Sequence, residues 1–133
     1  MNVRDIMTTN VVSLERNDPV EKADLLRKER RVRHFPVLDA EGRLVGVLSH
    51  RDFFRSALAA ALGYGERGYQ GVVKTLPVKE LMTENVVTVG PDATVADAAR
   101  LMAEKKIGCL PVVDGDLLVG IVTESDLLRL LIA

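Results

Sequence analysis

Apolar and polar positions follow the same order in both halves of this 133-residue chain. In each half an extended apolar stretch comes first, and a segment with apolar residues at helical spacing follows it. Two short apolar runs then come close together, which favours a pair of strands. These runs lie at 35–38 and 43–48 in the first half, and at 110–113 and 117–122 in the second. Each half therefore predicts strand, helix, strand, strand and a final helix, which begins after Ser49 or Thr123.

The residues themselves repeat along with this pattern. The segment 3–14 returns as 78–89, with Met-Thr-x-x-Val-Val in both copies, and the segment 46–52 returns as 120–126. A repeat over nearly the whole chain implies two similar units. We expect a first repeat at 1–62, a glycine-broken linker at 63–77 and a second repeat at 78–133. Each repeat is small enough that the two are expected to pack on each other.

Local signals mark where the first helix of each repeat begins and which face it buries. Asp18 before Pro19 predicts a helix with Asp18 as its N-cap, and Thr94 predicts the equivalent cap in the second repeat. Asp-Gly at 114–115 between two apolar runs predicts a hairpin. The spacing of apolar residues predicts two buried helix faces, formed by Val20, Ala23, Leu25 and Leu26 and by Val95, Ala98, Leu101 and Met102.

Composition narrows the class of protein. Apolar residues make up 47% of the chain and aromatic residues 4%, with no Trp, so the core is expected to be aliphatic. The formal net charge of −1 gives no reason to expect a nucleic-acid partner. A single cysteine, Cys109, cannot form an internal disulfide and suits a reducing cytoplasm. We expect no membrane span, because no apolar run approaches the roughly 20 residues that one needs, and no signal peptide at the N-terminus.

The ordered set of motifs resembles a tandem pair of CBS domains, often called a Bateman module. It consists of Met-Thr-x-x-Val-Val, x-Pro-Val-h-Asp and Gly-h-h-[Ser/Thr]-x-x-Asp, where h is apolar, present twice. The resemblance covers essentially the whole chain. It implies an α/β (α+β) fold of two β-α-β-β-α repeats about a pseudo-two-fold axis. It also implies a regulatory module that is not an enzyme, requires no cofactor and commonly forms a homodimer. Such a module binds AMP, ADP, ATP or S-adenosylmethionine between the repeats.

The same resemblance assigns roles to the last motif of each repeat. Asp52 and Asp126 match the residue that binds both ribose hydroxyls, and Ser49 and Thr123 match a residue that binds ribose or phosphate. A carboxylate suits a ribose because its two oxygens accept from two neighbouring donors. The alternative is structural: Ser-x-x-Asp and Thr-x-x-Asp are also capping boxes, in which the Asp bonds back to the helix start. A ligand would have to share the carboxylate with the cap or draw it away.

The resemblance also implies an adenine pocket and a phosphate site. The pocket would use the strand valines and the entries to the central strands: Val11, Val12, Phe35, Pro36, Val86, Val87, Leu110 and Pro111. The alternative for these residues is ordinary core. Arg33 and His34 match phosphate-binding positions, whereas the second repeat has Gly108 and Cys109 there. Arg30 and Arg31 lie next to these positions. For them the alternative to phosphate binding is a solvated helix end, where cations complement the helix dipole.

Two other classes of function remain as alternatives to ligand sensing. One is a structural dimerisation module with empty or vestigial sites, and the other is an enzyme. The enzyme is the least supported, because no nucleophile with a paired base and no acid–base pair assembles from the sequence.

His34, His50 and Cys109 lack the spacing of metal ligands, so no metal site is expected. Cys109 is expected to be a small buried side chain. A sensing module would also need a regulated partner protein, which the sequence does not identify.

Overall fold

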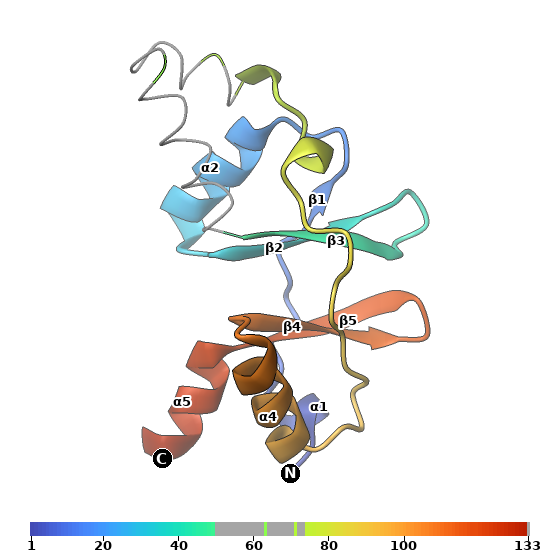
Figure 1. Cartoon of the computed structure of the whole chain (residues 1–133), viewed down its shortest axis with the longest axis vertical. Helices are drawn as coiled ribbons and strands as arrows, with labels where there is room; N and C mark the ends of the chain where they lie inside the picture. The colour runs from blue at the N-terminus through green and yellow to red at the C-terminus, as the bar shows by residue number, and fades with distance from the viewer. Residues whose placement is uncertain (50–62, 64–70, 72–73, 133) are drawn as a thin grey trace. The chain divides into compact units, whose positions relative to one another are not determined.

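The computed structural model describes residues 1–49, 63, 71 and 74–132. It has a mixed α/β fold, as the sequence predicts, and divides into two compact units (Figure 1). Unit 1 comprises Met1–Val11, Gly42–Leu44 and Val86–Ala133, and unit 2 comprises Val12–Glu41 and Val45–Asn85. Within the described part of the chain, none of the helices has the length and apolar character to cross a membrane.

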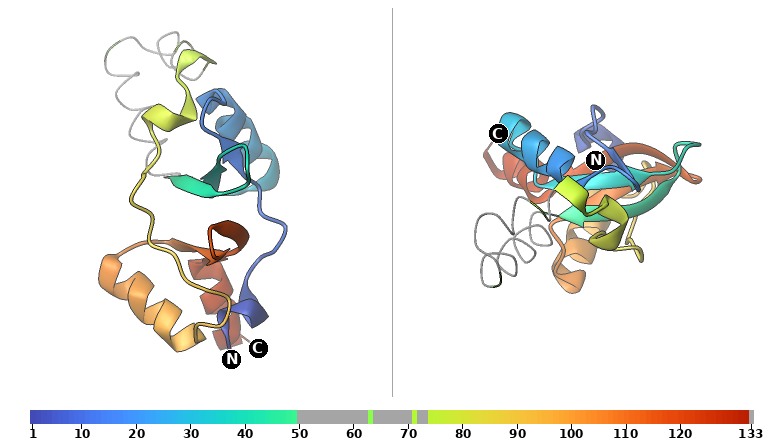
Figure 2. Two further views of the ribbon diagram at one scale, coloured as in Figure 1. Left: turned by 90° about the vertical axis from the view of Figure 1, so that its right-hand side faces the viewer. Right: turned by 90° about the horizontal axis from the view of Figure 1, so that it is seen from above.

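Unit 1 is built on an antiparallel hairpin of β4 (Cys109–Asp114) and β5 (Leu117–Thr123). Gly115 has a φ of 66° in the connecting turn, a left-handed conformation that suits glycine. Three helices cover one face of this hairpin: α1 (Val3–Ile6), α4 (Val95–Lys105) and α5 (Glu124–Ile132) (Figures 1 and 2). The buried core between them is aliphatic, as expected, and comprises Val3, Ala98, Met102, Leu110, Val112 and Val122.

Unit 2 contains a three-stranded sheet in the order β1-β2-β3. The strands are β1 (Leu14–Glu15), β2 (His34–Leu38) and β3 (Leu44–Ser49), and β1 runs parallel to β2. The helix α2 (Val20–Arg30) lies on one face of the sheet (Figure 1), and the short 3₁₀ helix η1 (Val78–Glu80) follows later in the chain. The buried core comprises Leu14, Val20, Ala23, Phe35, Val37, Leu48 and Val78. The predicted helix after Ser49 and the predicted linker lie largely outside the described residues.

The opening segment of each sequence repeat packs against the hairpin of the other repeat. In unit 1, Thr8 of the first repeat exchanges two backbone hydrogen bonds, of 2.9 and 3.0 Å, with Ile121 of β5. In unit 2, Thr83 of the second repeat exchanges two, of 2.9 and 3.0 Å, with Val47 of β3. The sequence repeats and the compact units therefore divide the chain differently.

Each of these crossings passes over a glycine of the Gly-h-h-[Ser/Thr] motif. A Cβ at Gly120 would lie 2.6 Å from Met7 Sδ and 3.1 Å from the Thr8 carbonyl oxygen. A Cβ at Gly46 would meet Met82 Sδ at 2.6 Å and the Thr83 carbonyl oxygen at 3.0 Å. Real Cβ atoms do not approach other atoms as closely as 2.6 Å. The glycine of the motif therefore makes room for the Met-Thr of the other repeat.

The start of α2 differs from the prediction, whereas the start of α4 confirms it. Asp18 is not the N-cap, because Pro19 occupies that position and α2 begins at Val20. The Asp18 carboxylate instead accepts from the Glu15 N–H at 2.8 Å and so closes the preceding turn. Thr94 caps α4 as predicted, since its Oγ1 accepts from the Asp97 N–H at 3.1 Å.

The buried face of α2 is narrower than predicted and includes a charge. Leu25 is exposed, whereas Asp24 is buried and pairs with Arg27 at 2.8 Å. The equivalent face of α4 is apolar, with Ala98 and Met102 buried. In the second repeat no strand is assigned to the extended stretch 86–89 within the described residues. It contributes one parallel bridge, between Val89 and Val112.

Candidate functional site

The candidate site in unit 1 lies where β5 ends and α5 begins. Thr123 is the last residue of β5, and Asp126 lies in the first turn of α5. The Asp126 side chain is only 4% exposed. Asp126 and Asp24 are the two charged residues among the buried ones that the structure describes. Burying a carboxylate costs free energy unless donors surround it, so the contacts of Asp126 matter.

Three donors surround the Asp126 carboxylate. Oδ2 accepts from the Thr123 backbone N–H at 2.8 Å and from Thr123 Oγ1 at 3.2 Å. Oδ1 accepts from Arg129 NH1 at 2.8 Å. The first of these bonds is the capping interaction that the sequence offered as the alternative to ribose binding. Capping fixes the carboxylate at the helix start. A carboxylate has about four acceptor positions, and the three donors use three of them, so roughly one remains open.

The surroundings of Thr123 come from several segments of unit 1. Cys109 of β4 lies directly opposite Thr123 in the hairpin register. The Glu124 N–H donates to the Gly108 carbonyl at 3.2 Å, and Thr8 bonds to Ile121 two residues before Thr123. A backbone bond therefore holds the start of α5 to Gly108, the residue before β4, and the opening segment of the chain crosses next to it.

Cys109 is buried, as predicted, and desolvation raises the pKa of its thiol to about 12. At neutral pH the thiol is therefore protonated. The thiolate is the nucleophilic form of cysteine, so Cys109 serves here as a small core side chain.

The equivalent site of the first repeat is described only in part. Ser49 ends β3 and is half-buried. Asp52 lies outside the described residues, so its predicted role stays a prediction. Because the opening segment of each repeat packs on the hairpin of the other, β3 in unit 2 is contacted by Met82 and Thr83 and not by Met7 and Thr8.

The residues proposed for the adenine pocket divide between the two units. Phe35, Pro36, Leu110 and Pro111 are buried, so their side chains form core, which was the alternative interpretation. Val12 packs against the core of unit 2, and Val87 against that of unit 1. Val86 is half-buried in unit 1. Val11 belongs to unit 1, together with Asp126 and apart from Phe35 and Pro36.

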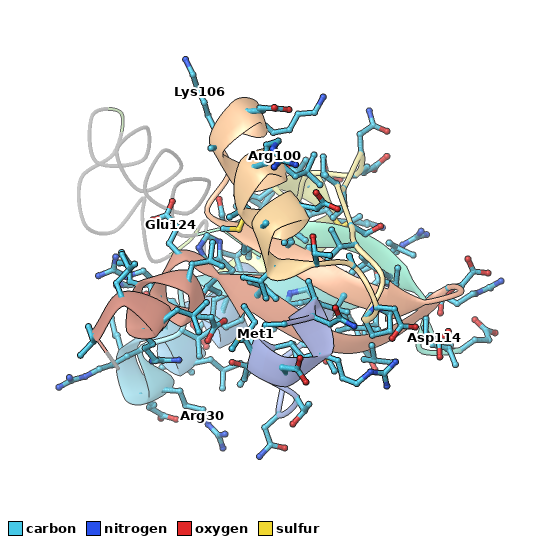
Figure 3. The ribbon with its side chains drawn as sticks, turned by 90° about the horizontal axis from the view of Figure 1, so that it is seen from below. Met1, Arg30, Arg100, Lys106, Asp114 and Glu124 are labelled. Carbon is cyan, nitrogen blue, oxygen red and sulfur yellow. The ribbon has the colours of Figure 1, made fainter. Side chains whose placement is uncertain are left out.

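The residues proposed for phosphate binding lie where the chain passes from α2 into β2. Arg33 is exposed, while His34 is half-buried at the start of β2. Neither residue is in the unit that contains Asp126. Arg30 ends α2 (Figure 3) and Arg31 follows as its C-cap. Both are exposed, at the end of the helix where cations complement its dipole.

Arg129 is the contact that sequence reasoning missed. It stands three residues after Asp126, and Arg55 stands three residues after Asp52, so the repeat itself carried the signal. The Arg129 guanidinium forms an ion pair with the Asp126 carboxylate, although 70% of the Arg129 side chain is exposed. Within the residues that the structure describes, no group of three or more His, Cys, Asp and Glu side chains is arranged to hold a metal ion.

Comparison with known proteins gives matches over nearly the whole chain. The chain is 36% identical to the CBS domain-containing protein YhcV of Bacillus subtilis over 126 residues, which cover 95% of this chain and 82% of that protein. It is 35% identical to protein MJ1404 of Methanocaldococcus jannaschii over 130 residues, 96% of this chain. The match spans only 31% of MJ1404, so that relative is about three times longer.

Two similar solved structures contain adenosine compounds. The CBS domain pair of protein MJ0100, in complex with 5'-methylthioadenosine and S-adenosyl-L-methionine, has a TM-score of 0.79 at 31% identity and covers 98% of this chain and 95% of its own. CBSX2 in complex with AMP has a TM-score of 0.79 at 30% identity, covering 98% and 96%. The family model for the CBS domain matches residues 3–59 and 78–133. The chain therefore belongs to the CBS domain family and carries two copies of that domain.

Proposed function

We propose that this chain is a regulatory module that senses an adenosine-containing ligand such as AMP, ADP, ATP or S-adenosylmethionine. The observation that carries the proposal is the buried Asp126 carboxylate at the start of α5, next to Thr123. Two similar CBS domain structures hold AMP, 5'-methylthioadenosine and S-adenosylmethionine, which share an adenosine group.

The chemistry of this position suits a ribose with a phosphate or another polar group attached. A vicinal diol offers two O–H donors, and a carboxylate offers acceptors at matching separation. The N–H groups of the first turn of α5 and the helix dipole favour an anion nearby. Thr123 is half-exposed at this position, and its hydroxyl can bond to the same ligand.

The remaining assignments extend the proposal to the rest of the ligand. We propose Ser49 and Asp52 as the equivalent ribose residues of the first repeat. Backbone groups beside the core residues Phe35, Pro36, Leu110 and Pro111, and along Val11, Val12, Val86 and Val87, would contact adenine. Arg33 and His34 would contact phosphate, which the second repeat cannot match with Gly108 and Cys109.

Sensing requires that the ligand binds one conformation better than another. A ligand shifts an equilibrium only by its differential affinity for the two states. We propose that a separate protein, in the cytoplasm, responds to that shift. We propose no catalytic role, because the chemistry found at the start of α5 is that of binding.

A thermal-shift panel tests the ligand proposal. We expect at least one of AMP, ADP, ATP and S-adenosylmethionine to stabilise the protein. At ~100 times its Kd a ligand adds about 2.7 kcal/mol to the free energy of unfolding, which raises Tm by several degrees. NAD serves as a larger adenosine-containing comparison. A panel in which no compound raises Tm would favour the structural alternative instead.

A second property, homodimerisation, is favoured by the surface of α5. Leu128, Leu131 and Ile132 recur at helical spacing and are exposed, with Leu131 at 83%. An apolar stripe of this kind on a helix is typically covered by a partner. We propose that a second copy of the chain covers it, since most soluble oligomers are homo-oligomers with two-fold symmetry.

Charge substitution on this stripe tests the dimer. Leu131→Glu is expected to convert the dimer to a monomer, because a buried unpaired carboxylate at an interface is costly. The matched control is Leu117→Glu, since Leu117 is also exposed but begins β5, away from the stripe. Light scattering gives the mass in each case. A wild-type monomer, or a Leu131→Glu dimer of unchanged stability, would refute this interface.

A further inference from the structure

Arg129 occupies an acceptor position that the proposed ribose site needs. The Asp126 carboxylate has about four acceptor positions in all. Thr123 uses two of them on Oδ2, through its N–H at 2.8 Å and its hydroxyl at 3.2 Å. Arg129 NH1 uses one on Oδ1 at 2.8 Å. Among the described residues this leaves roughly one position, which is enough for one hydroxyl but not for the diol of a ribose.

The three contacts differ in how easily they can be released. The Thr123 N–H belongs to the backbone at the start of α5, and its bond to Asp126 is part of the helix cap. The Arg129 side chain is 70% exposed, so water can solvate its guanidinium once it leaves. The pair is part-buried, because the Asp126 side chain is only 4% exposed, but water screens its exposed cation. Arg129 is therefore the contact that a ligand can displace most readily.

We propose that Arg129 is a positioning residue that occupies Asp126 in the ligand-free protein and moves aside when a ribose diol binds. The inference rests on the proposed function and adds a regulatory contact to it. With the ligand absent, Arg129 fixes the carboxylate and balances its charge. With the ligand bound, the two hydroxyls take the position on Oδ1 that Arg129 held and the one that was open.

The sequence contains the same arrangement twice. Arg55 follows Asp52 at the spacing by which Arg129 follows Asp126. Asp52 and Arg55 lie outside the described residues, so the argument rests on Asp126 and Arg129. Because the spacing is the same in both repeats, the arginine goes together with the proposed ribose residue. It is not peculiar to one helix.

Removing the guanidinium should strengthen the binding of a ribose. Arg129→Gln is expected to bind adenosine about two- to five-fold more tightly than wild type, because the ribose no longer has to displace a solvent-screened cation from Asp126. The gain should be smaller with 2'-deoxyadenosine, because a single hydroxyl can use the open position without displacing Arg129. Both nucleosides are neutral and lack a phosphate. The loss of the Arg129 charge therefore cannot change their affinity through a phosphate group.

A similar ion pair elsewhere supplies the matched control. Arg100 pairs with Asp97 on α4 at 2.8 Å with the same sequence spacing, and both side chains are exposed. Arg100 lies on α4, whereas Glu124 marks the start of α5, which carries the proposed site (Figure 3). Arg100→Gln removes the same charge and is expected to leave both affinities unchanged.

The outcomes separate this inference from the proposed function. If wild type binds none of the adenosine compounds, the function fails and the inference with it. If wild type binds but Arg129→Gln gains nothing, gains equally with both nucleosides, or gains no more than Arg100→Gln, only the inference fails. Side-chain NMR of wild type with AMP gives a second measurement: the Arg129 Nε–Hε resonance should shift at saturation, and an unchanged resonance would overturn the inference.

Discussion

Gly120→Ala is expected to destabilise the protein by about 1–3 kcal/mol, the cost of overpacking a well-filled site. The added Cβ would lie 2.6 Å from Met7 Sδ, 2.9 Å from Met7 Cγ and 3.1 Å from the Thr8 carbonyl oxygen. The methionine side chain can move, but the carbonyl is held by the Ile121 N–H at 3.0 Å. The clash therefore strains the crossing of the opening segment over β5. Urea denaturation of the purified variant measures the change in the free energy of unfolding.

Two further variants show whether the crossing is the cause. Gly90→Ala is the matched control, because a Cβ there meets no atom within 4 Å and the change should stay within about 0.5 kcal/mol. Adding Met7→Ala to Gly120→Ala removes the nearest atoms, so the pair should cost less than the sum of the single changes. If Gly120→Ala were as mild as Gly90→Ala, the opening segment would not pack on β5 as described.

Asp126→Asn is expected to weaken ligand binding by roughly 10- to 100-fold. Hydrogen bonds to a charged group contribute about 1.5–3 kcal/mol, and every 1.4 kcal/mol is tenfold in affinity. Asparagine keeps one oxygen that can accept from the Thr123 N–H, so the helix cap survives. It replaces the other acceptor by an NH₂ donor, which cannot accept from a ribose hydroxyl. Titration with AMP measures the loss.

The control for this variant is Asp97→Asn. Asp97 also carries an arginine partner three residues later in its helix, Arg100, but lies exposed on α4. This change should leave AMP affinity unaltered. A similar loss in both variants would point to a general charge effect, and no loss in Asp126→Asn would remove Asp126 from the proposed site.

Local features of the sequence predicted most of the fold. The Asp-Gly turn predicted the β4–β5 hairpin, Thr94 predicted the start of α4, and the repeat predicted that β2 and β3 would be followed by a matching pair. The errors were local too. The sequence predicts Asp18 as a helix cap, yet its carboxylate accepts from the N–H of Glu15. Asp, Asn, Ser and Thr bond to nearby backbone groups in turns as well as at helix starts, so their presence alone does not choose between the two.

The exchange of opening segments could not be predicted from the repeats. Met7-Thr8 and Met82-Thr83 are alike, and so are the glycines that they cross, Gly46 and Gly120. Either segment could therefore make the same local contacts on either hairpin, and the pattern does not distinguish the two arrangements. Arg129 was missed for a different reason: an arginine in a helix is usually solvated, and only the buried position of Asp126 makes its contact informative.

The most direct test of the central claim is a two-dimensional amide NMR titration of this 14.6 kDa protein with AMP. The Thr123 N–H donates to the Asp126 carboxylate, so ribose hydroxyls that bind this carboxylate alter its surroundings. The Thr123 resonance and those of the first turn of α5 should therefore shift and saturate together. Gly90 and the Asp114–Asp116 turn should stay unchanged. Saturable shifts confined to other parts of the chain, or no shifts at millimolar AMP and S-adenosylmethionine, would contradict an adenosine site at the start of α5.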